Sequence, residues 1–529
     1  MLLPAQGSNN EVSILAKIGA FVLETLTTGM YAQPLDTLRE FVQNSADSIR
    51  RAEAKGLLAP GEGKIEIFVD PKNRRLSIRD NGEGVPSDLV RERLINIGMS
   101  AKQLGSDAGF RGIGRIAGVA YCRNLSFITS FSGETKASVV SWDCEGIRRQ
   151  ISPTRRNVEA KELSEVIDHN TLIKSETASE SDHYFEAQMN DIDMSVADLF
   201  LSWHELEFYL SQVAPVGFDA QRFIFAPKIT EWTVKHGLYL PCVNLVIKGP
   251  DFQRQVFKPY KGHYHTIRNN YEIEIEDVVF YPENAGPQSH FWLWYGKSNL
   301  LGTIREEEAA GFRFRKHNIA IGGPERVAEL FREIAGSNER FNGYYIGEIH
   351  VLSEAAIPNA RRDGFEANQE WSSIRQQLIW FLRERSSDIR TASQARNRPV
   401  PKIVKAAQQV MREAEDTIQT GFTSKEHKEE LLDRIQKEID KTKLALSSDR
   451  NETEQKELQR TIALLDKTAK EVEQAGELVV RKLKSSLDRT QRKLIQDILA
   501  TLRDVLDEEH YRLAKTAILR KYGLGKDRP

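Results

Sequence analysis

Residues 38–50 of the chain read LREFVQNSADSIR, and their periodicity predicts an amphipathic α-helix. At helical spacing the apolar side would hold Leu38, Phe41, Val42, Ser45 and Ile49. The opposite side would hold three polar residues, Glu40, Asn44 and Asp47. Such a polar stripe is typical of a solvated helix face, and a helix that lines a ligand site has the same pattern. Periodicity alone leaves both interpretations open.

The segment that follows predicts a β-hairpin that ends in a glycine-containing turn. KIEIFVD (64–70) and RRLSIRD (74–80) flank the turn residues PKN, and DNGEGV (80–85) comes directly after the second strand. Gly82 and Gly84 let the backbone turn sharply and lie close against a flat ligand, beside the carboxylate of Asp80. Since a DNGxG stretch is also a common structural turn, the motif alone does not identify a site.

A glycine-rich stretch follows, and we interpret it as a lid or phosphate-binding loop. NIGMSAK (96–102) contains Ser100 and Lys102, and GFRGIGRIAG (109–118) leads into an apolar helix. Backbone amides of a glycine-rich loop at a helix N-terminus can cradle a phosphate. Taken singly, each glycine cluster is weak evidence for a ligand.

Composition excludes several classes of protein. With 74 basic and 76 acidic residues, bulk charge gives no support for a nucleic-acid coat or a membrane-surface protein, although local patches remain an option. The three cysteines, Cys122, Cys144 and Cys242, are too few and too widely spaced for a disulfide framework or a zinc cluster. We find neither a secretory leader nor an apolar run of the roughly 18 residues that a membrane span needs. A cytoplasmic protein is therefore expected.

In their order along the chain, these motifs resemble the GHKL ATPases, the superfamily shared by gyrase, the ninety-kilodalton heat-shock chaperones, sensor histidine kinases and mismatch-repair MutL. That family carries an acid and an Asn on a first helix, then a DxGxG turn, a glycine-rich lid and a Thr on a late strand. The matching elements here are Glu40 with Asn44, DNGEGV, GFRGIG, and Thr171 in NTLIKS. The resemblance implies a Bergerat-type α/β sandwich that binds ATP and Mg²⁺.

The resemblance also implies roles for single residues. Asn44 matches the Mg²⁺ ligand, Asp80 matches the acceptor for the adenine amino group, and Glu40 matches the general base that activates the attacking water. Thr171 would assist Asp80 through its hydroxyl group and a water molecule. The remaining expected nucleotide-binding positions are Gly82, Gly84, Met99, Lys102, Gly109, Phe110, Gly112, Ile113 and Gly114. Arg39 and Asp47 are expected to support the helix.

Glu40 also bears on the subfamily. Sensor histidine kinases typically carry Asn at this position and a phosphoacceptor His on a preceding helical pair, which we do not find. Type II topoisomerases would need a tyrosine cleavage domain and a much longer chain. ATPases with a second, transducer-like α/β domain remain.

Downstream segments resemble the middle part of bacterial heat-shock-chaperone-like ATPases: FYLSQVAPVGF (208–218), NIAIGG (318–323) and YYIGEIHVLSEAAIPNARRDGFE (344–366). In that architecture a basic residue of the second domain reaches the terminal phosphate. The candidates are Arg361 and Arg362, with Lys316 behind them, because a guanidinium pairs with phosphate oxygens bidentately. A surface basic pair beside Asp363 is the alternative.

We expect an α+β protein of three parts. Residues 1–185 would form the ATP-binding domain, 186–390 a transducer-like α/β middle domain, and 391–529 a helical, coiled-coil-like region. The last region follows the linker RTASQARNRPVPK and shows apolar residues at spacings of three, four and seven.

Three functions remain open. The first is a chaperone-like conformational switch in which ATP closes the lid, two N-terminal domains dimerise, and hydrolysis resets the machine on a protein partner. The second attaches the same ATPase to nucleic acid, as in MORC-like and MutL-like clamps, with bacterial defence as one setting. The third is a scaffold that binds ATP with negligible turnover, and Glu40 argues against it. The sequence does not identify the client or the oligomeric state.

Overall fold

A computed structural model describes residues 18–27, 29, 33–98, 114–151, 161–268, 270–422, 424–446, 450–475 and 489–522. The chain divides into two units, Met1–Arg390 and Thr391–Pro529, and each is described by itself. Helices and strands are both abundant, which confirms the α+β class.

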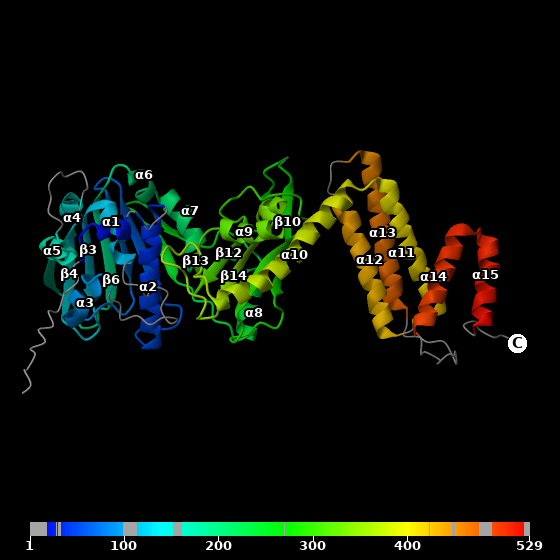
Figure 1. Cartoon of the computed structure of the whole chain (residues 1–529), viewed down its shortest axis with the longest axis horizontal. Coiled ribbons are helices and arrows are strands. Elements are labelled where there is room, and N and C mark those ends of the chain that lie inside the picture. Colours follow the sequence, from blue (N-terminus) through cyan, green and yellow to red (C-terminus); the bar gives the residue numbers. More distant parts are fainter. Residues whose placement is uncertain are drawn as a thin grey trace, which may run out of the picture. The chain divides into compact units, whose positions relative to one another are not determined.

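The first unit begins with an eight-stranded sheet in the order β5-β4-β3-β6-β2-β1-β7-β8, on which helices pack (Figure 1). Its strands are β1 (Lys64–Asp70), β2 (Arg75–Asp80), β3 (Cys122–Ser130), β4 (Lys136–Asp143), β5 (Thr171–Thr177), β6 (Tyr184–Ile192), β7 (Asn244–Lys248) and β8 (Gln253–Gln255). Its helices are α1 (Val22–Thr27), α2 (Asp36–Ala54), α3 (Val90–Leu94), α4 (Cys144–Ile151), α5 (Leu163–His169), α6 (Ala197–Phe200) and α7 (Trp203–Val213), with short 3₁₀ helices η1 (Ser87–Leu89) and η2 (Gly114–Ala120).

Helix α2 has the predicted amphipathic pattern, and its apolar side packs on β1 and β2. Leu38, Phe41 and Ile49 are buried in the same core as the inward residues of the two strands. The helix ends before Gly56, whose φ of 71° is the left-handed conformation common just past a helix C-terminus.

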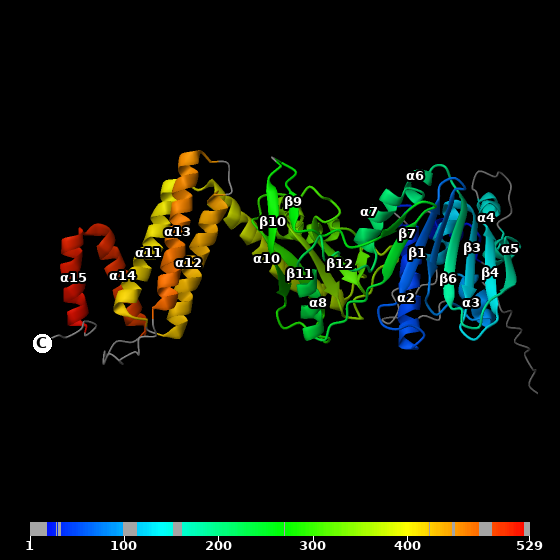
Figure 2. The ribbon, with the colours of Figure 1, turned by 180° about the vertical axis from the view of Figure 1, so that it is seen from behind.

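The predicted hairpin is confirmed, because β1 and β2 pair antiparallel with Ile65 opposite Asp80. Residues 240–249, LPCVNLVIKG, lie within the range expected for the middle domain, but they supply β7, which runs parallel to β1 in the first sheet (Figure 2). Strands β6, β7 and β8 thus extend the first sheet past residue 185. A parallel pairing between strands so distant in the chain depends on tertiary packing, which local periodicity does not encode.

A six-stranded sheet in the order β13-β12-β14-β11-β10-β9 follows. Its strands are β9 (His263–His265), β10 (Glu272–Tyr281), β11 (Phe291–Ser298), β12 (Gly311–Lys316), β13 (Ile319–Ile321) and β14 (Ile346–Val351). Its helices are α8 (Ala226–Lys235), α9 (Glu325–Ile334), η3 (Gly336–Tyr344) and α10 (Gln369–Asn397). Alternate residues of β11 enter separate cores, Phe291 and Leu293 with α9 and α10, and Trp292 and Trp294 with α8. The sheet therefore lies between two helical layers.

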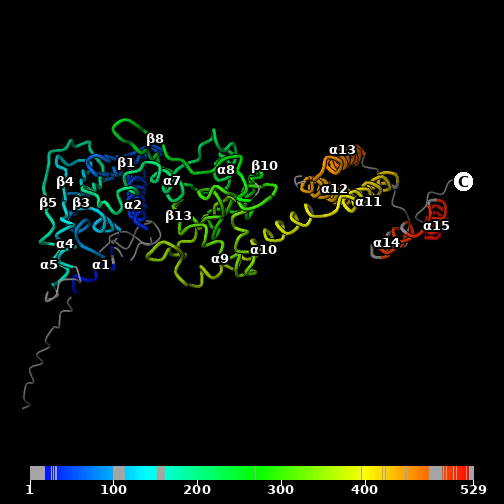
Figure 3. Tube along the Cα trace, turned by 90° about the horizontal axis from the view of Figure 1, so that it is seen from above, coloured from blue at the N-terminus to red at the C-terminus, as the bar shows by residue number. Residues whose placement is uncertain are grey.

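The second unit contains only helices among its described residues, as predicted. They are α11 (Val400–Thr420), α12 (Lys425–Leu446), α13 (Glu452–Gln474), α14 (Arg489–Val505) and α15 (Glu508–Lys521). Helices α11, α12 and α13 lie side by side around buried Ile435, Ile439 and Leu465 (Figure 3). Across the described residues of both units, no helix combines the length and hydropathy that crossing a membrane requires.

Candidate active site

The polar side of α2 is covered by other parts of the chain, so it is not a solvated face. Glu40 is 7% exposed and Asp47 is 1% exposed, while Asn44, one turn after Glu40, is half-buried. The Oε1 atom of Glu40 lies 3.0 Å from Nε of Arg362, which is 7% exposed. The carboxylate of Glu40, on the helix that packs against the first sheet, thus contacts the guanidinium of Arg362. Arg362 comes after β14, a strand of the second sheet, in the chain.

Gly114 lies directly against Glu40. A Cβ atom at position 114 would be 2.2 Å from Oε2 of Glu40, so only glycine fits while the carboxylate keeps this position. The glycine loop therefore enters the site at its C-terminal end, where η2 begins. Six expected nucleotide-binding residues lie outside the described residues: Met99, Lys102, Gly109, Phe110, Gly112 and Ile113.

Asp80 ends β2 and is almost fully buried beneath α2. Its Oδ1 accepts a hydrogen bond from the backbone N–H of Gly82 at 2.9 Å. Among the described residues, Oδ2 has no hydrogen-bond partner although it is buried. Burial raises the pKa of Asp80 to about 7, against the lowering effect of the hydroxyl groups of Ser45 and Ser48. A buried acceptor without a donor is unfavourable, and an amino group of a bound ligand would satisfy it.

The turn after Asp80 is tied to α2 by charge. The Glu83 carboxylate pairs with Arg51 and, at 2.6 Å, with Lys55. Burial alone would raise the pKa of Glu83, but hydrogen bonds from Lys55 and Arg51 outweigh it and lower that pKa. Gly82 packs on Ser48, where a Cβ would lie 2.2 Å from the hydroxyl oxygen. The DNGEGV turn is thereby held against the helix that carries Glu40 and Asn44.

Gly84 tests this close packing. Its φ is 71°, and a Cβ there would lie 1.9 Å from the carbonyl oxygen of Ser130. We expect Gly84→Ala to lower the free energy of unfolding by about 3 kcal/mol, measured by urea denaturation, because backbone strain adds to the collision. Gly56→Ala is the matched control, since Gly56 has the same φ but open space around it, and should cost about 1 kcal/mol. Equal losses in the two variants would contradict the packing argument.

The structure does not bring Thr171 to Asp80. Thr171 begins β5 at the edge of the sheet, and β4, β3 and β6 lie between β5 and β2. Four strand spacings of about 4.8 Å place the two strands roughly 19 Å apart. The late strand that pairs with β2 is β6, with Phe185 opposite Asp80. Matching NTLIKS by residue type could not reveal this, because the order of strands is a property of the folded sheet.

Two side chains beside the turn were missed by sequence reasoning. Nδ1 of His183 lies 2.8 Å from the carbonyl oxygen of Gly82. The Thr129 hydroxyl accepts from the N–H of Val85 at 2.8 Å and donates to the carbonyl of Tyr184 at 2.9 Å. Both residues brace the DNGEGV turn from the β3 and β6 side, and no local motif marks them.

The three basic candidates, Arg361, Arg362 and Lys316, differ in whether they contact Glu40. Arg362 reaches Glu40, whereas the Arg361 side chain is exposed and its carbonyl accepts from Nη2 of Arg39 at 3.1 Å. Lys316 is buried, and its Nζ donates to the carbonyl of Ser353 at 2.6 Å. Burial lowers the pKa of Lys316 to about 8, partly offset by Glu354 and Glu370. Only Arg362 of these three contacts the proposed base among the described residues.

Arg39 and Asp47 make contacts that suit support of α2. Nη1 of Arg39 lies 3.5 Å from the Asp36 carboxylate, which also accepts from the Tyr209 hydroxyl at 2.8 Å. Asp47 pairs with Arg50 at 3.0 Å.

Part of this chain matches a known protein family. Residues 33–176 match the family described as histidine kinase-, DNA gyrase B-, and HSP90-like ATPase. This segment is a domain of that ATPase family. It contains α2, the DNGEGV turn and Gly114, and it ends within β5. We call it the ATPase domain.

The ATPase domain is also similar to curated chaperones. The Chaperone protein HtpG of Enterobacter sp. (strain 638) is 25% identical over 143 residues, which cover 24% of this chain and 23% of that protein. The HtpG of Geobacter metallireducens is 26% identical over 144 residues, covering 24% and 22% respectively. The similarity thus spans less than a quarter of the length of these relatives. It supports an ATP-binding domain of chaperone-like type.

Proposed function

We propose that this chain is a Mg²⁺-dependent switch that binds and hydrolyses ATP. The observation that carries the proposal is the buried contact between Glu40 and Arg362, at 3.0 Å. This contact joins Glu40, the expected general base in the ATPase domain, to Arg362, which comes after β14 in the chain. A nucleotide bound beside Glu40 and Arg362 would therefore contact both the ATPase domain and the segment that carries Arg362.

The residues fit an adenine nucleotide with its metal. The unpaired Oδ2 of Asp80 would accept from the adenine amino group, and the amide of Asn44 would offer an oxygen ligand to Mg²⁺. Bound Mg²⁺ would neutralise phosphate charge. Glu40 would orient a water molecule and accept its proton, since phosphoryl transfer depends mainly on positioning and charge neutralisation.

Arg362 would couple the binding of ATP to the position of Glu40 and of the segment around Arg362. The Arg362 guanidinium occupies Oε1 of the Glu40 carboxylate at 3.0 Å, so Glu40 is held in this position while the pair lasts. A terminal phosphate would compete for the same guanidinium, because phosphate oxygens accept its forked N–H groups. Binding would then free Glu40 and move the segment around Arg362.

We extend the proposal to a chaperone-like cycle in which residues 94–118 close as a lid and two copies pair through their ATPase domains. We propose a protein as the client, since the similar HtpG proteins are named as chaperones. Helix α14 offers a further surface for pairing, since Leu494, Ile498 and Val505 are exposed at helical spacing.

The test is turnover by Arg362→Ala. We expect the rate constant for ATP hydrolysis to fall about 100-fold or more, measured by phosphate release at saturating ATP, because the terminal phosphate loses its cation. Arg361→Ala is the matched control and should hydrolyse ATP at nearly the wild-type rate, since its side chain is exposed. A rate for Arg362→Ala equal to or above that of the wild type would contradict the proposed role.

A further inference from the structure

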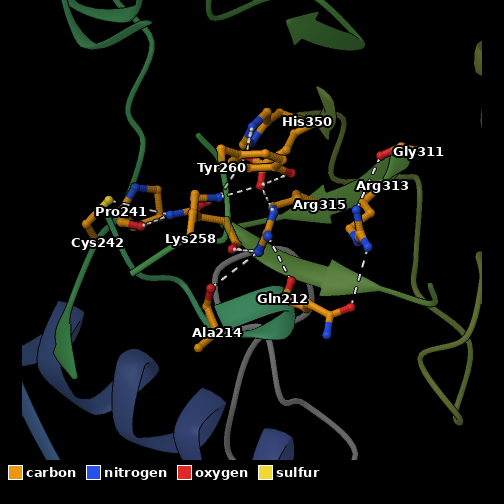
Figure 4. Close-up of polar contacts among 12 residues, drawn as sticks. Gln212, Ala214, Pro241, Cys242, Lys258, Tyr260, Gly311, Arg313, Arg315 and His350 are labelled. Atoms are coloured by element: carbon orange, nitrogen blue, oxygen red, sulfur yellow. Dashed lines mark hydrogen bonds and ion pairs between the residues drawn. The ribbon is translucent and has the colours of Figure 1, made fainter. Parts of the chain in front are cut away.

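A cluster of charged side chains is fully buried in the second half of the first unit (Figure 4). Both carboxylate oxygens of Glu348 on β14 accept from Nζ of Lys258 at 2.7 Å, and Oε1 accepts from Nε of Arg315 on β12 at 2.5 Å. Tyr260 and His350 add contacts at 3.2 Å. Burial alone would raise the pKa of Glu348, but the charges of Arg315 and Lys258 hold it well below its usual range.

Such a cluster is weak evidence for stability, because desolvating charges offsets much of their attraction. Its value lies in the arrangement that it enforces. Nζ of Lys258 donates to Oδ1 of Asn318 at 2.8 Å, and Nη1 of Arg315 donates to the carbonyl of Asn318 at 2.9 Å. Asn318 has a φ of 62° in the tight turn between β12 and β13. Lys258 and Arg315 therefore both donate hydrogen bonds to Asn318.

The same cluster holds the segments that lead to and from the first sheet. Nδ2 of Asn318 donates to the carbonyl of Pro241 at 2.8 Å, shortly before β7. Arg315 donates to the carbonyls of Gln212 at 2.8 Å and Ala214 at 3.3 Å, at the end of α7. Figure 4 shows Gln212 and Ala214 beside Arg315, and Pro241 on a separate segment near Lys258. The Asn318 turn is thus held against the segment before β7 and the end of α7.

Asn318 is connected to Arg362 through a short strand and one backbone hydrogen bond. Residues Ile319–Ile321 form β13, and the next residue, Gly322, donates its N–H to the carbonyl of Arg362 at 2.8 Å. Gly322 has a φ of 68°, and a Cβ there would lie 2.7 Å from the carbonyl oxygen of Asp363. The Arg362 N–H donates to Asn359 at 3.0 Å. A displacement of the turn at Asn318 would accordingly be transmitted to the backbone that carries Arg362.

We propose that Asn318, gripped by Lys258 of the buried cluster, is a positioning residue for Arg362. Asn318 fixes the position of β13 and Gly322, and Gly322 in turn fixes the backbone of Arg362. The Arg362 guanidinium is thereby positioned to contact Glu40. Its effect on turnover rests on the proposed function, whereas its effect on the Arg362 backbone does not.

The test uses the full chain with Asn318→Gly and Lys258→Met. Glycine keeps the positive φ while removing the side-chain bonds to Lys258, Pro241 and Cys242. Methionine removes the bond from residue 258 to Asn318 while leaving Glu348 paired with Arg315. Asn270→Gly is the matched control, because Asn270 has a φ of 51° in the same half of the unit but is exposed and outside the cluster. Amide hydrogen exchange is measured for Gly322, Arg362 and, as an internal reference, β10 and β11.

In both variants we expect the amides of Gly322 and Arg362 to exchange about tenfold faster or more, with β10 and β11 unchanged. Turnover of ATP should fall about tenfold or more while the dissociation constant for ATP is unchanged, since only the position of Arg362 is altered. Unchanged exchange at Gly322 and Arg362 would overturn the proposal, as would faster exchange throughout the second sheet. If the wild type hydrolyses no ATP, the proposed function fails, and the exchange rates still decide the role of Asn318.

Discussion

Replacing Glu40 by alanine is expected to lower the rate constant for ATP hydrolysis by about 10²–10⁴-fold, the contribution typical of a general base. Glu40 is buried, lies against Gly114 and contacts Arg362, so no neighbouring carboxylate among its described contacts replaces it. The dissociation constant for ATP should stay within about threefold of the wild type, because the adenine acceptor, Asp80, is untouched. Phosphate release at saturating ATP and equilibrium binding of ATP measure the two effects.

Glu40→Gln serves as the matched control. It keeps the shape and a hydrogen-bond acceptor for Arg362 but cannot accept a proton at neutral pH. Equal losses of turnover in the alanine and glutamine variants would assign the defect to the missing base. Turnover in Glu40→Ala within about twofold of the wild type would refute the mechanism, since an essential base contributes far more than that.

Asp80→Asn is expected to weaken ATP binding by at least about 10–100-fold, the value of a hydrogen bond to a charged acceptor. The buried Oδ2, which has no partner among the described residues, would be the position lost as an acceptor. Inosine triphosphate provides a sharp comparison, because it carries a carbonyl oxygen where ATP carries the amino group. The wild type should prefer ATP strongly, and the variant should lose that preference. Tight and selective ATP binding by the variant would overturn the adenine assignment.

The stability of Asp80→Asn distinguishes lost binding from lost folding. Burial raises the pKa of Asp80 from 3.8 to about 7 in the folded protein. A raised acid pKa means that the folded state binds the proton more tightly, so this group's stabilising contribution is present below pH 4 and is lost as the pH rises to 7. The ligand-free variant should therefore unfold at the same or a higher urea concentration than the wild type at pH 8. The difference between the two proteins should shrink towards pH 4.

Much of the ATPase domain could be predicted because its signals are local. The period of α2, the hairpin of β1 and β2, and the glycines beside Asp80 each follow from residues close together in the chain. Gly84 is a clear case, since the sharp turn after Asp80 needs the positive φ that glycine adopts readily. Thr171 shows the limit of such signals. Its residue type and its place on a strand match the motif, yet strand order separates it from Asp80.

By itself, the sequence determined which residues can do chemistry: an acid and an amide one helical turn apart, a carboxylate at a strand end, and arginines far downstream. These features depend on residue type and short spacing, which a single sequence displays. Only the tertiary structure decided that Arg362, and not Arg361, meets Glu40, that β7 joins the first sheet, and that Asn318 is gripped by a buried cluster. Contacts between residues hundreds of positions apart are selected by packing and by the satisfaction of buried charge in the whole fold, and no local pattern carries them.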